Sequence, residues 1–212
     1  MQITEKMRDD IRKAIGDLEK STSGEMVCVV AQSSARYVFF PMLWAAGIAL
    51  LLPLINPISA LADRPPPVTF PLQSLAFLAL AGLFLCTPLR YFLTPLAIRE
   101  NQCQRAAFEQ FFLRGLHETA HRSGVLLFVS VAERHAQIIA DVGINGKVRD
   151  GVWKGIIDAL TADIRNEKVH EGFLTAISSC TGILASHFPE KRKAKNELDN
   201  RLVELPQAAF IS

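Results

Sequence analysis

Two stretches in the first half of the chain carry apolar residues at nearly every position. They are residues 38–62 and 68–89, and neither contains Asp, Glu, Lys or Arg. A helix of about 20 mostly apolar residues can cross a hydrocarbon core of roughly 30 Å. A buried helix pair in a globular core would normally show a polar stripe, which both stretches lack. The pattern therefore predicts a two-helix transmembrane hairpin over residues 38–89, with residues 63–67 as its tip.

Basic residues gather at the outer ends of this predicted hairpin, whereas the tip has only Arg64. The basic residues near the outer ends are Lys20, Arg36, Arg90, Arg99 and Arg105. By the positive-inside rule, the polar parts on both sides of the hairpin lie in the cytosol. We therefore expect an integral membrane protein with two spans, both termini cytoplasmic and the lipid bilayer as its surroundings. Pro41, Pro53 and Pro57 are expected to kink or break the first span.

The polar part before the hairpin, residues 1–37, predicts one helix and one strand. Apolar residues recur there at spacings of three and four, which is typical of an amphipathic helix. The run 26–31 is apolar at successive positions, as expected for a strand covered on both faces. The apolar helix positions are Ile3, Met7, Ile11, Ala14, Ile15 and Leu18. One helix and one strand cannot form a stable domain, so they need partners from beyond the hairpin.

The polar part after the hairpin, residues 90–188, supplies those partners. Its pattern predicts a helix from about Arg99 to His121, a buried strand over 125–131, a short strand over about 136–141 and two further amphipathic helices. Alternating helices and apolar strands favour a layered α/β/α fold with a central sheet. We therefore expect one α/β domain that is split by the transmembrane hairpin.

The remaining residues, 189–212, form a polar tail with a dense basic cluster. The cluster consists of Lys191, Arg192, Lys193 and Lys195. On a cytosolic tail such charges gain roughly 1 kcal/mol each near anionic lipid, which predicts a lipid-facing role. A solvated tail is the alternative. Residues 196–205 could extend this segment into a short surface helix.

Charge and cysteine content exclude several function classes. The formal net charge is only +2, and basic residues alternate with acidic ones, so no nucleic-acid partner is expected. The four cysteines are far apart and form no CxxC pair, which argues against a disulfide framework or a zinc knuckle. No cofactor is predicted.

One motif suggests a metal site. His117-Glu118-Thr119-Ala120-His121 has the HExxH spacing that places two zinc ligands on one helical face. A catalytic site needs a third protein ligand, but the position where one class of zinc peptidases carries it is Leu127. Ordinary surface histidines at a helix end are the favoured interpretation, and His117 and His121 as zinc ligands are the alternative.

Three segments together resemble the TPM domain family, in particular its bacterial membrane-protein branch. They are Ser23-Gly24-Glu25 with the strand after it, Ser123-Gly124-Val125-Leu126 with Glu133-Arg134 and the run from Ile138 to Gly143, and the segment 166–177. The resemblance implies a TPM domain interrupted by the hairpin, in a protein of the bacterial inner membrane. It also implies either weak acid phosphatase activity or a role in assembling or modulating a membrane partner.

A phosphatase needs a carboxylate and a basic group that converge on a phosphate. Asp141, Arg134 and Glu25 lie near predicted strand ends and are the catalytic candidates, although no phosphate-binding loop or nucleophile motif accompanies them. We therefore expect a noncatalytic, membrane-anchored module that binds or assembles another membrane protein. A weak phosphohydrolase is the first alternative, and a zinc peptidase is the second.

Overall fold

The computed structural model describes residues 4–52, 66–119, 121–148, 150–189 and 202–205. The chain divides into two compact units. The first combines Met1–Ala35 with Glu100–Ser212, and the second is Arg36–Arg99. Each unit is described separately below.

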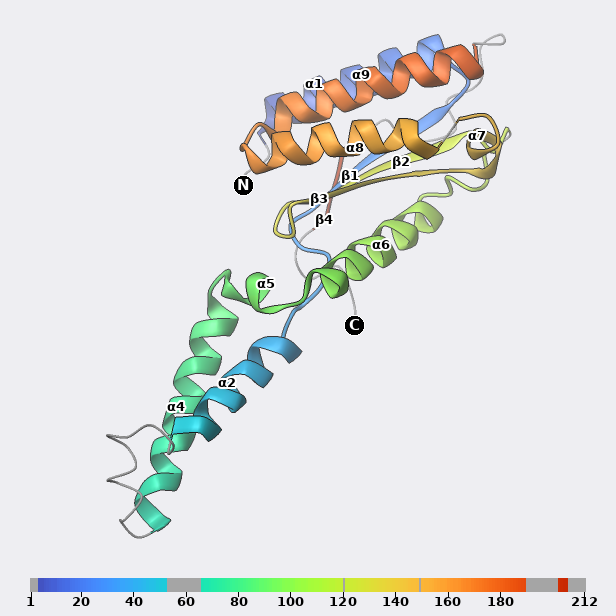
Figure 1. The fold of residues 1–212 in the computed structure, drawn as a ribbon. Coiled ribbons are helices and arrows are strands. Elements are labelled where there is room, and N and C mark those ends of the chain that lie inside the picture. The colour runs from blue at the N-terminus through green and yellow to red at the C-terminus, as the bar shows by residue number, and fades with distance from the viewer. Residues whose placement is uncertain (1–3, 53–65, 120, 149, 190–201, 206–212) are drawn as a thin grey trace. The chain divides into compact units, whose positions relative to one another are not determined.

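A mixed sheet lies at the centre of the first unit (Figure 1). Its strands are β1 (Glu25–Ala31), β2 (Gly124–Ser130), β3 (His135–Ala140) and β4 (Leu202–Leu205), in the order β3-β2-β1-β4. β1 pairs in parallel with β2, from Glu25 opposite Gly124 to Ala31 opposite Ser130, and in parallel with β4 on its other side. β3 runs antiparallel to β2. A strand from before the apolar stretches thus pairs directly with one from after them.

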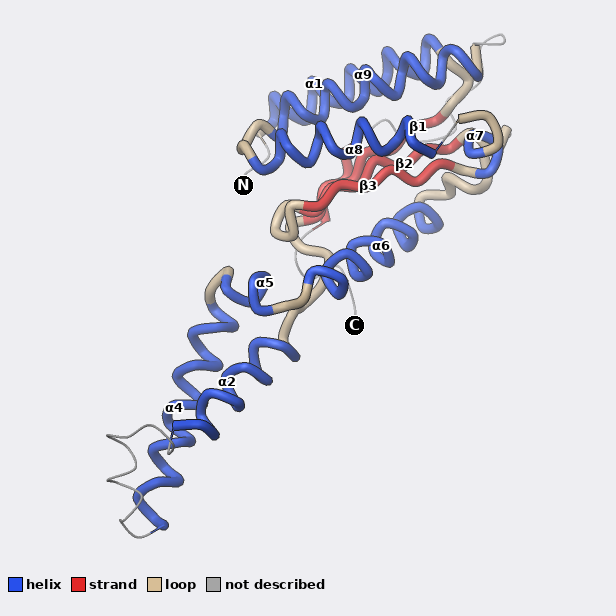
Figure 2. Tube along the Cα trace, in the orientation of Figure 1, coloured by secondary structure: helices blue, strands red, loops and turns tan. Residues whose placement is uncertain are grey.

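The two central strands are buried along their whole length because helices cover both faces of the sheet. Every residue of β1 and β2 is buried. Helices α1 (Glu5–Ser21), α8 (Asp150–Arg165) and α9 (Val169–His187) cover one face, and α6 (Leu96–Leu113), from Glu100 onward, covers the other (Figures 1 and 2). A short helix, α7 (Val142–Asn145), follows β3. This arrangement confirms the predicted α/β fold, with its apolar strands between helical layers.

The helix before β2 ends eight residues earlier than the predicted end at His121. α6 stops at Leu113 because Gly115 takes a positive φ of 67°. The Gly115 N–H donates to the Phe112 carbonyl at 3.0 Å, and the Leu116 N–H donates to the Phe111 carbonyl at 3.2 Å. This pair of hydrogen bonds is the Schellman helix stop, which favours glycine at the left-handed position.

The prediction for the tail was also incomplete. Leu202–Leu205 is a strand that pairs with β1, not the end of a surface helix. Its side chains point alternately to the two faces of the sheet: Leu202 packs against one core, Val203 and Leu205 pack against the other, and Glu204 is exposed. Residues 196–201 and the basic cluster of Lys191, Arg192, Lys193 and Lys195 lie outside the described residues.

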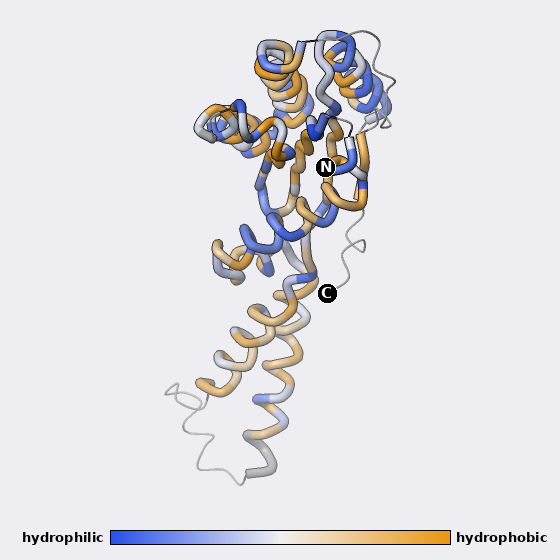
Figure 3. The backbone as a smooth tube through the Cα atoms, turned by 90° about the vertical axis from the view of Figure 1, so that its right-hand side faces the viewer, coloured by the Kyte–Doolittle hydropathy of each residue, from blue (hydrophilic) through white to orange (hydrophobic). Residues whose placement is uncertain are grey.

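The second unit contains the two apolar stretches. Its helices are α2 (Phe39–Leu51), α4 (Pro66–Cys86) and the short α5 (Leu89–Leu93), and α2 packs against α4. Most of the backbone of α2 and α4 carries apolar residues (Figure 3). Residues 53–65, which include the end of the first predicted span and most of the tip, lie outside the described residues. Within the part of the chain that is described, no helix combines the length and the hydropathy needed to cross a membrane.

Candidate functional site

Two of the three candidate catalytic residues lie at the same end of the sheet. Glu25 begins β1 and pairs with Gly124, the first residue of β2. Asp141 directly follows β3, and its backbone N–H donates to the Gly124 carbonyl at 2.9 Å. Glu25 and Asp141 are both buried. With neighbouring strands about 4.8 Å apart, the two residues flank Gly124 at a backbone separation of about 10 Å.

The third candidate, Arg134, lies at the opposite end. It is the last residue of the turn between β2 and β3, it has a φ of 51°, and its side chain is exposed. All six residues of β3 separate Arg134 from Asp141. At about 3.3 Å per residue this puts their backbones about 20 Å apart. The structure therefore does not bring Arg134 together with Asp141 or Glu25.

A different arginine, Arg122, forms an ion pair with the carboxylate of Asp141. Arg122 donates from Nε to Oδ2 at 2.6 Å and from Nη2 to Oδ1 at 2.9 Å. The hydrogen bond to Asp141 raises the pKa of the Arg122 guanidinium above its ordinary value. Asp141 also begins α7, where Oδ1 accepts from the Val142 N–H at 2.8 Å. The carboxylate is 4% exposed and the guanidinium 52% exposed, so one side of the pair faces solvent.

Glycines allow the backbone segments around this ion pair to pack closely. A methyl group at Gly143 would lie 2.6 Å from the Arg122 carbonyl oxygen and 2.8 Å from that of His121. A methyl group at Gly124 would lie 2.2 Å from the Leu116 carbonyl oxygen. Side chains do not fit at such distances. Gly124 and Gly143 are therefore explained by the close approach of neighbouring backbone, and Arg122 and Asp141 fix these segments to each other.

His117 and His121, the alternative zinc ligands, do not lie on a helix. Both follow the end of α6, in a segment of turns and bends. His117 stacks its ring edge-on against Phe112, with centroids 5.0 Å apart, and its Nε2 lies 3.5 Å from Oε1 of Glu118. Among the described residues, no three His, Cys, Asp or Glu side chains are grouped so as to hold a metal ion.

A buried polar cluster that sequence reasoning missed surrounds Glu133, at the carboxyl ends of β1 and β2. Oε1 of Glu133 accepts from the Ser34 N–H at 2.8 Å and from the Ser33 hydroxyl at 3.2 Å. Oε2 accepts from the Ser130 hydroxyl at 2.5 Å. The Ser34 hydroxyl also donates to Cys103 Sγ on α6 at 3.3 Å. The cluster fixes the loop after β1 to the turn after β2.

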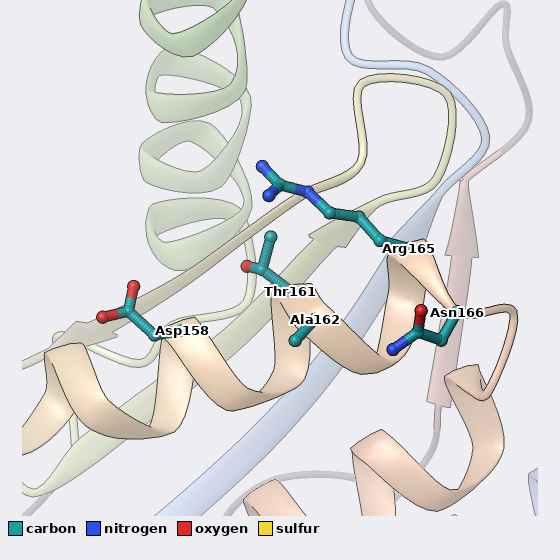
Figure 4. Close-up of a pocket in the computed structure, with 5 residues that line it drawn as sticks. All are labelled: Asp158, Thr161, Ala162, Arg165 and Asn166. Atoms are coloured by element: carbon teal, nitrogen blue, oxygen red, sulfur yellow. The ribbon is translucent and has the colours of Figure 1, made fainter.

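A surface hollow runs along the carboxyl-terminal half of α8 (Figure 4). Its lining comes from one segment, and the Asp158 and Arg165 side chains extend at its two ends. None of the candidate residues lies in it. The lining residues are Asp158, Thr161, Ala162, Arg165 and Asn166.

The fold is shared with a solved bacterial protein. The chain is similar to the BA42 protein of the psychrophilic bacterium Bizionia argentinensis, whose structure was determined by NMR. The TM-score is 0.59, the sequence identity is 21%, and the match covers 96% of each chain. Comparison with curated proteins finds no match.

The family model of the TPM domain matches residues 94–183. The matched region runs from the start of α6 through β2, β3, α7 and α8 into α9. It includes Arg122, Asp141 and both loop glycines of the ion-pair region, as well as Glu133. Residues 94–183 thus match the TPM domain model, as the motifs within this region indicated.

Proposed function

We propose that this chain is a membrane-anchored binding or assembly module. The helical unit Arg36–Arg99 would insert into the lipid bilayer as a hairpin, and the α/β unit would bind another membrane protein. Because both connections to the α/β unit leave the hairpin at its outer ends, the two polar parts are on one side of the membrane. The excess of Lys and Arg at those ends supports a cytosolic location at a bacterial inner membrane.

The observation that best supports membrane insertion is the packing of α2 against α4, in which small residues are buried and large apolar residues are exposed. The buried residues of α2 are Pro41, Ala45 and Ala49, which recur every four residues. The large apolar side chains point outward instead: Leu50 is 72% exposed and Phe70 73% exposed. In water the hydrophobic effect drives large apolar side chains inward. In lipid that drive is absent, and helices pack through small residues that let their backbones approach.

The hydrogen bonds of polar side chains in this unit also support a lipid environment. Gln73 on α4 donates from Nε2 to the Ala49 carbonyl on α2 at 3.5 Å, and Trp44 donates from Nε1 to the Leu93 carbonyl at 3.3 Å. Polar groups that bond across helices are common in membrane bundles because hydrocarbon offers no other partner.

A binding role agrees better with the α/β unit than catalysis does. The Asp141 carboxylate is bonded to Arg122 and to a backbone N–H, and Arg134 lies at the other end of β3. A phosphohydrolase would need a carboxylate and basic groups that converge on one substrate. Glu133 likewise bonds to the loops that it connects. These contacts favour a rigid surface that recognises a partner.

The test is recovery of a partner from native membranes. The full chain, tagged at its amino terminus, is cross-linked in membranes of its host, solubilised in mild detergent and purified. We expect it to resist carbonate extraction and to recover one membrane protein in near-stoichiometric amount. The matched control is Val29→Asp, which places a charge inside β1 and unfolds the α/β unit without changing the hairpin.

Partner recovery that persists in Val29→Asp would contradict binding through the α/β unit. Release by carbonate would contradict the anchor. Phosphate-ester turnover that is lost in Asp141→Asn, with no partner recovered, would favour the phosphohydrolase.

A further inference from the structure

The edge of β1 that faces away from β2 is covered by a short strand from outside the matched TPM region. β4 spans only Leu202–Leu205 and pairs with Cys28–Ala31. β1 itself has seven residues, all of them buried and most of them apolar. An uncovered apolar strand of this kind is a template for pairing with another polypeptide. The four residues of β4 therefore control access to this edge.

The contacts of β4 define what this edge recognises. The Gln32 N–H donates to the Leu205 carbonyl at 3.1 Å, and Arg8 on α1 forms an ion pair with Glu204. Leu202 packs against the core under α1 and α9, while Val203 and Leu205 pack against the core under α6. The edge thus accepts an extended segment that runs parallel to β1 and has the pattern apolar, apolar, acidic, apolar.

β4 is held less firmly than the other strands. All four of its residues are partly or fully exposed, whereas β2 is buried throughout. Its ladder with β1 covers only four residues, whereas the ladder between β1 and β2 covers seven. The Arg8–Glu204 pair is at the surface, with about a third or more of each side chain exposed, and such pairs add little stability. Edge elements with these properties open more easily than the core does.

We infer that the β1 edge is a binding site for an extended segment of the partner protein, and that β4 occupies this site in the same chain as a competing strand. The inference rests on the proposed binding function and names its mode, which is strand addition to a sheet edge. Charge complementarity predicts an Asp or Glu in the third position of the partner segment, where it would form an ion pair with Arg8. Apolar residues in the first, second and fourth positions would pack against the two cores.

The test measures binding of a fluorescein-labelled peptide with the sequence of residues 200–207 to the full chain in detergent. Val203→Pro removes a backbone donor from β4 and vacates the edge. We expect this variant to bind the peptide at least about tenfold more tightly than the wild type, because a tethered competitor acts at an effective concentration of about millimolar. Equal affinity of the two proteins would overturn the inference.

Charge reversal tests the recognition itself. In the Val203→Pro background, Arg8→Glu should weaken peptide binding severalfold, and a peptide with Arg in the Glu204 position should restore it. Arg12→Glu, an exposed residue on the same helix, is the matched control and should leave affinity unchanged. Equal effects of the Arg8 and Arg12 changes would contradict a specific site.

Hydrogen exchange of the wild type provides a test that needs no variant. Amides of Leu202–Leu205 should exchange at least about tenfold faster than those of β2, since β4 opens locally. Equal protection would overturn the inference. A wild-type dimer that the peptide converts to monomer would assign the edge to a second copy of the chain instead. Failure of the peptide assay with the membrane partner still recovered would refute this site alone and leave the proposed function standing.

Discussion

Replacing Gly124 by alanine tests how the α/β unit is held together. The added methyl group would lie 2.2 Å from the Leu116 carbonyl oxygen and 2.9 Å from the carbonyl carbon, where ordinary contacts begin near 3.4 Å. The backbone would have to move by about 1 Å, and the Schellman hydrogen bond fixes Leu116 while β1 and Asp141 fix Gly124. Overpacking a rigid site costs typically 1–3 kcal/mol and sometimes more. We expect a loss of about 3 kcal/mol, a large part of a stability of about 5–15 kcal/mol.

The control is Gly155→Ala, in the exposed part of α8. Apart from the adjacent residues and the backbone of its own helix, no atom lies within 4 Å of a methyl group there, so the substitution should stabilise the helix by about 1 kcal/mol through helix propensity. Urea unfolding is followed by the fluorescence of buried Trp153 in a Trp44→Phe background, which leaves one of the two tryptophans. The Gly124→Ala midpoint should fall by about 1 M or more. A midpoint equal to that of the background would refute the close packing of β2 against the Leu116 segment.

Three further predictions concern other parts of the chain. Glu133→Ala should lower the unfolding free energy by about 2–4 kcal/mol, because it leaves buried donors of Ser34 and Ser130 without their acceptor, and Glu133→Gln should cost less in the same urea assay. Burial lowers the pKa of His135 below its ordinary 6.5, so the folded state favours the neutral ring, and stability should fall as the pH drops below about 6.5; His135→Gln should reduce that slope in urea titrations at several pH values. Reporters fused after Gln32 and after Ser130 should both report cytosol and one at Asp63 the opposite side, whereas an opposite-side signal from Ser130 would refute this topology.

The strands and the layered fold could be predicted because their signal is local. β1 and β2 are buried on both faces, so each is a continuous apolar run in the sequence, and such a run is recognised as a buried strand. The end of α6 was missed because Leu116 continues the apolar spacing of the helix beyond Leu113. Gly115 was the available signal, since a positive φ after a helix favours glycine. β4 was missed because four residues in a charged segment carry too short a pattern to separate strand from helix.

The candidate site was harder to predict because it depends on pairing between distant segments. Asp141 and Glu25 lie at the same end of the sheet only because β3 runs antiparallel to β2, and the same reversal places Arg134 at the other end. No spacing rule connects Arg122 to Asp141. The glycines next to them were recognised as motif positions, but their reason, close contact with the carbonyls of Leu116 and Arg122, needs coordinates.

The anchor is tested most directly by the depth of Trp44 in lipid. Trp44 on α2 is 53% exposed, whereas Trp153 lies in the core of the α/β unit. The Trp153→Phe variant, reconstituted in vesicles containing brominated lipid, leaves Trp44 as the reporter, and the Trp44→Phe variant provides the matched control. We expect lipids brominated in the acyl chain to quench Trp44 strongly and to leave Trp153 unquenched. Equal fluorescence of Trp44 in brominated and ordinary vesicles would contradict insertion of the helical unit into the bilayer.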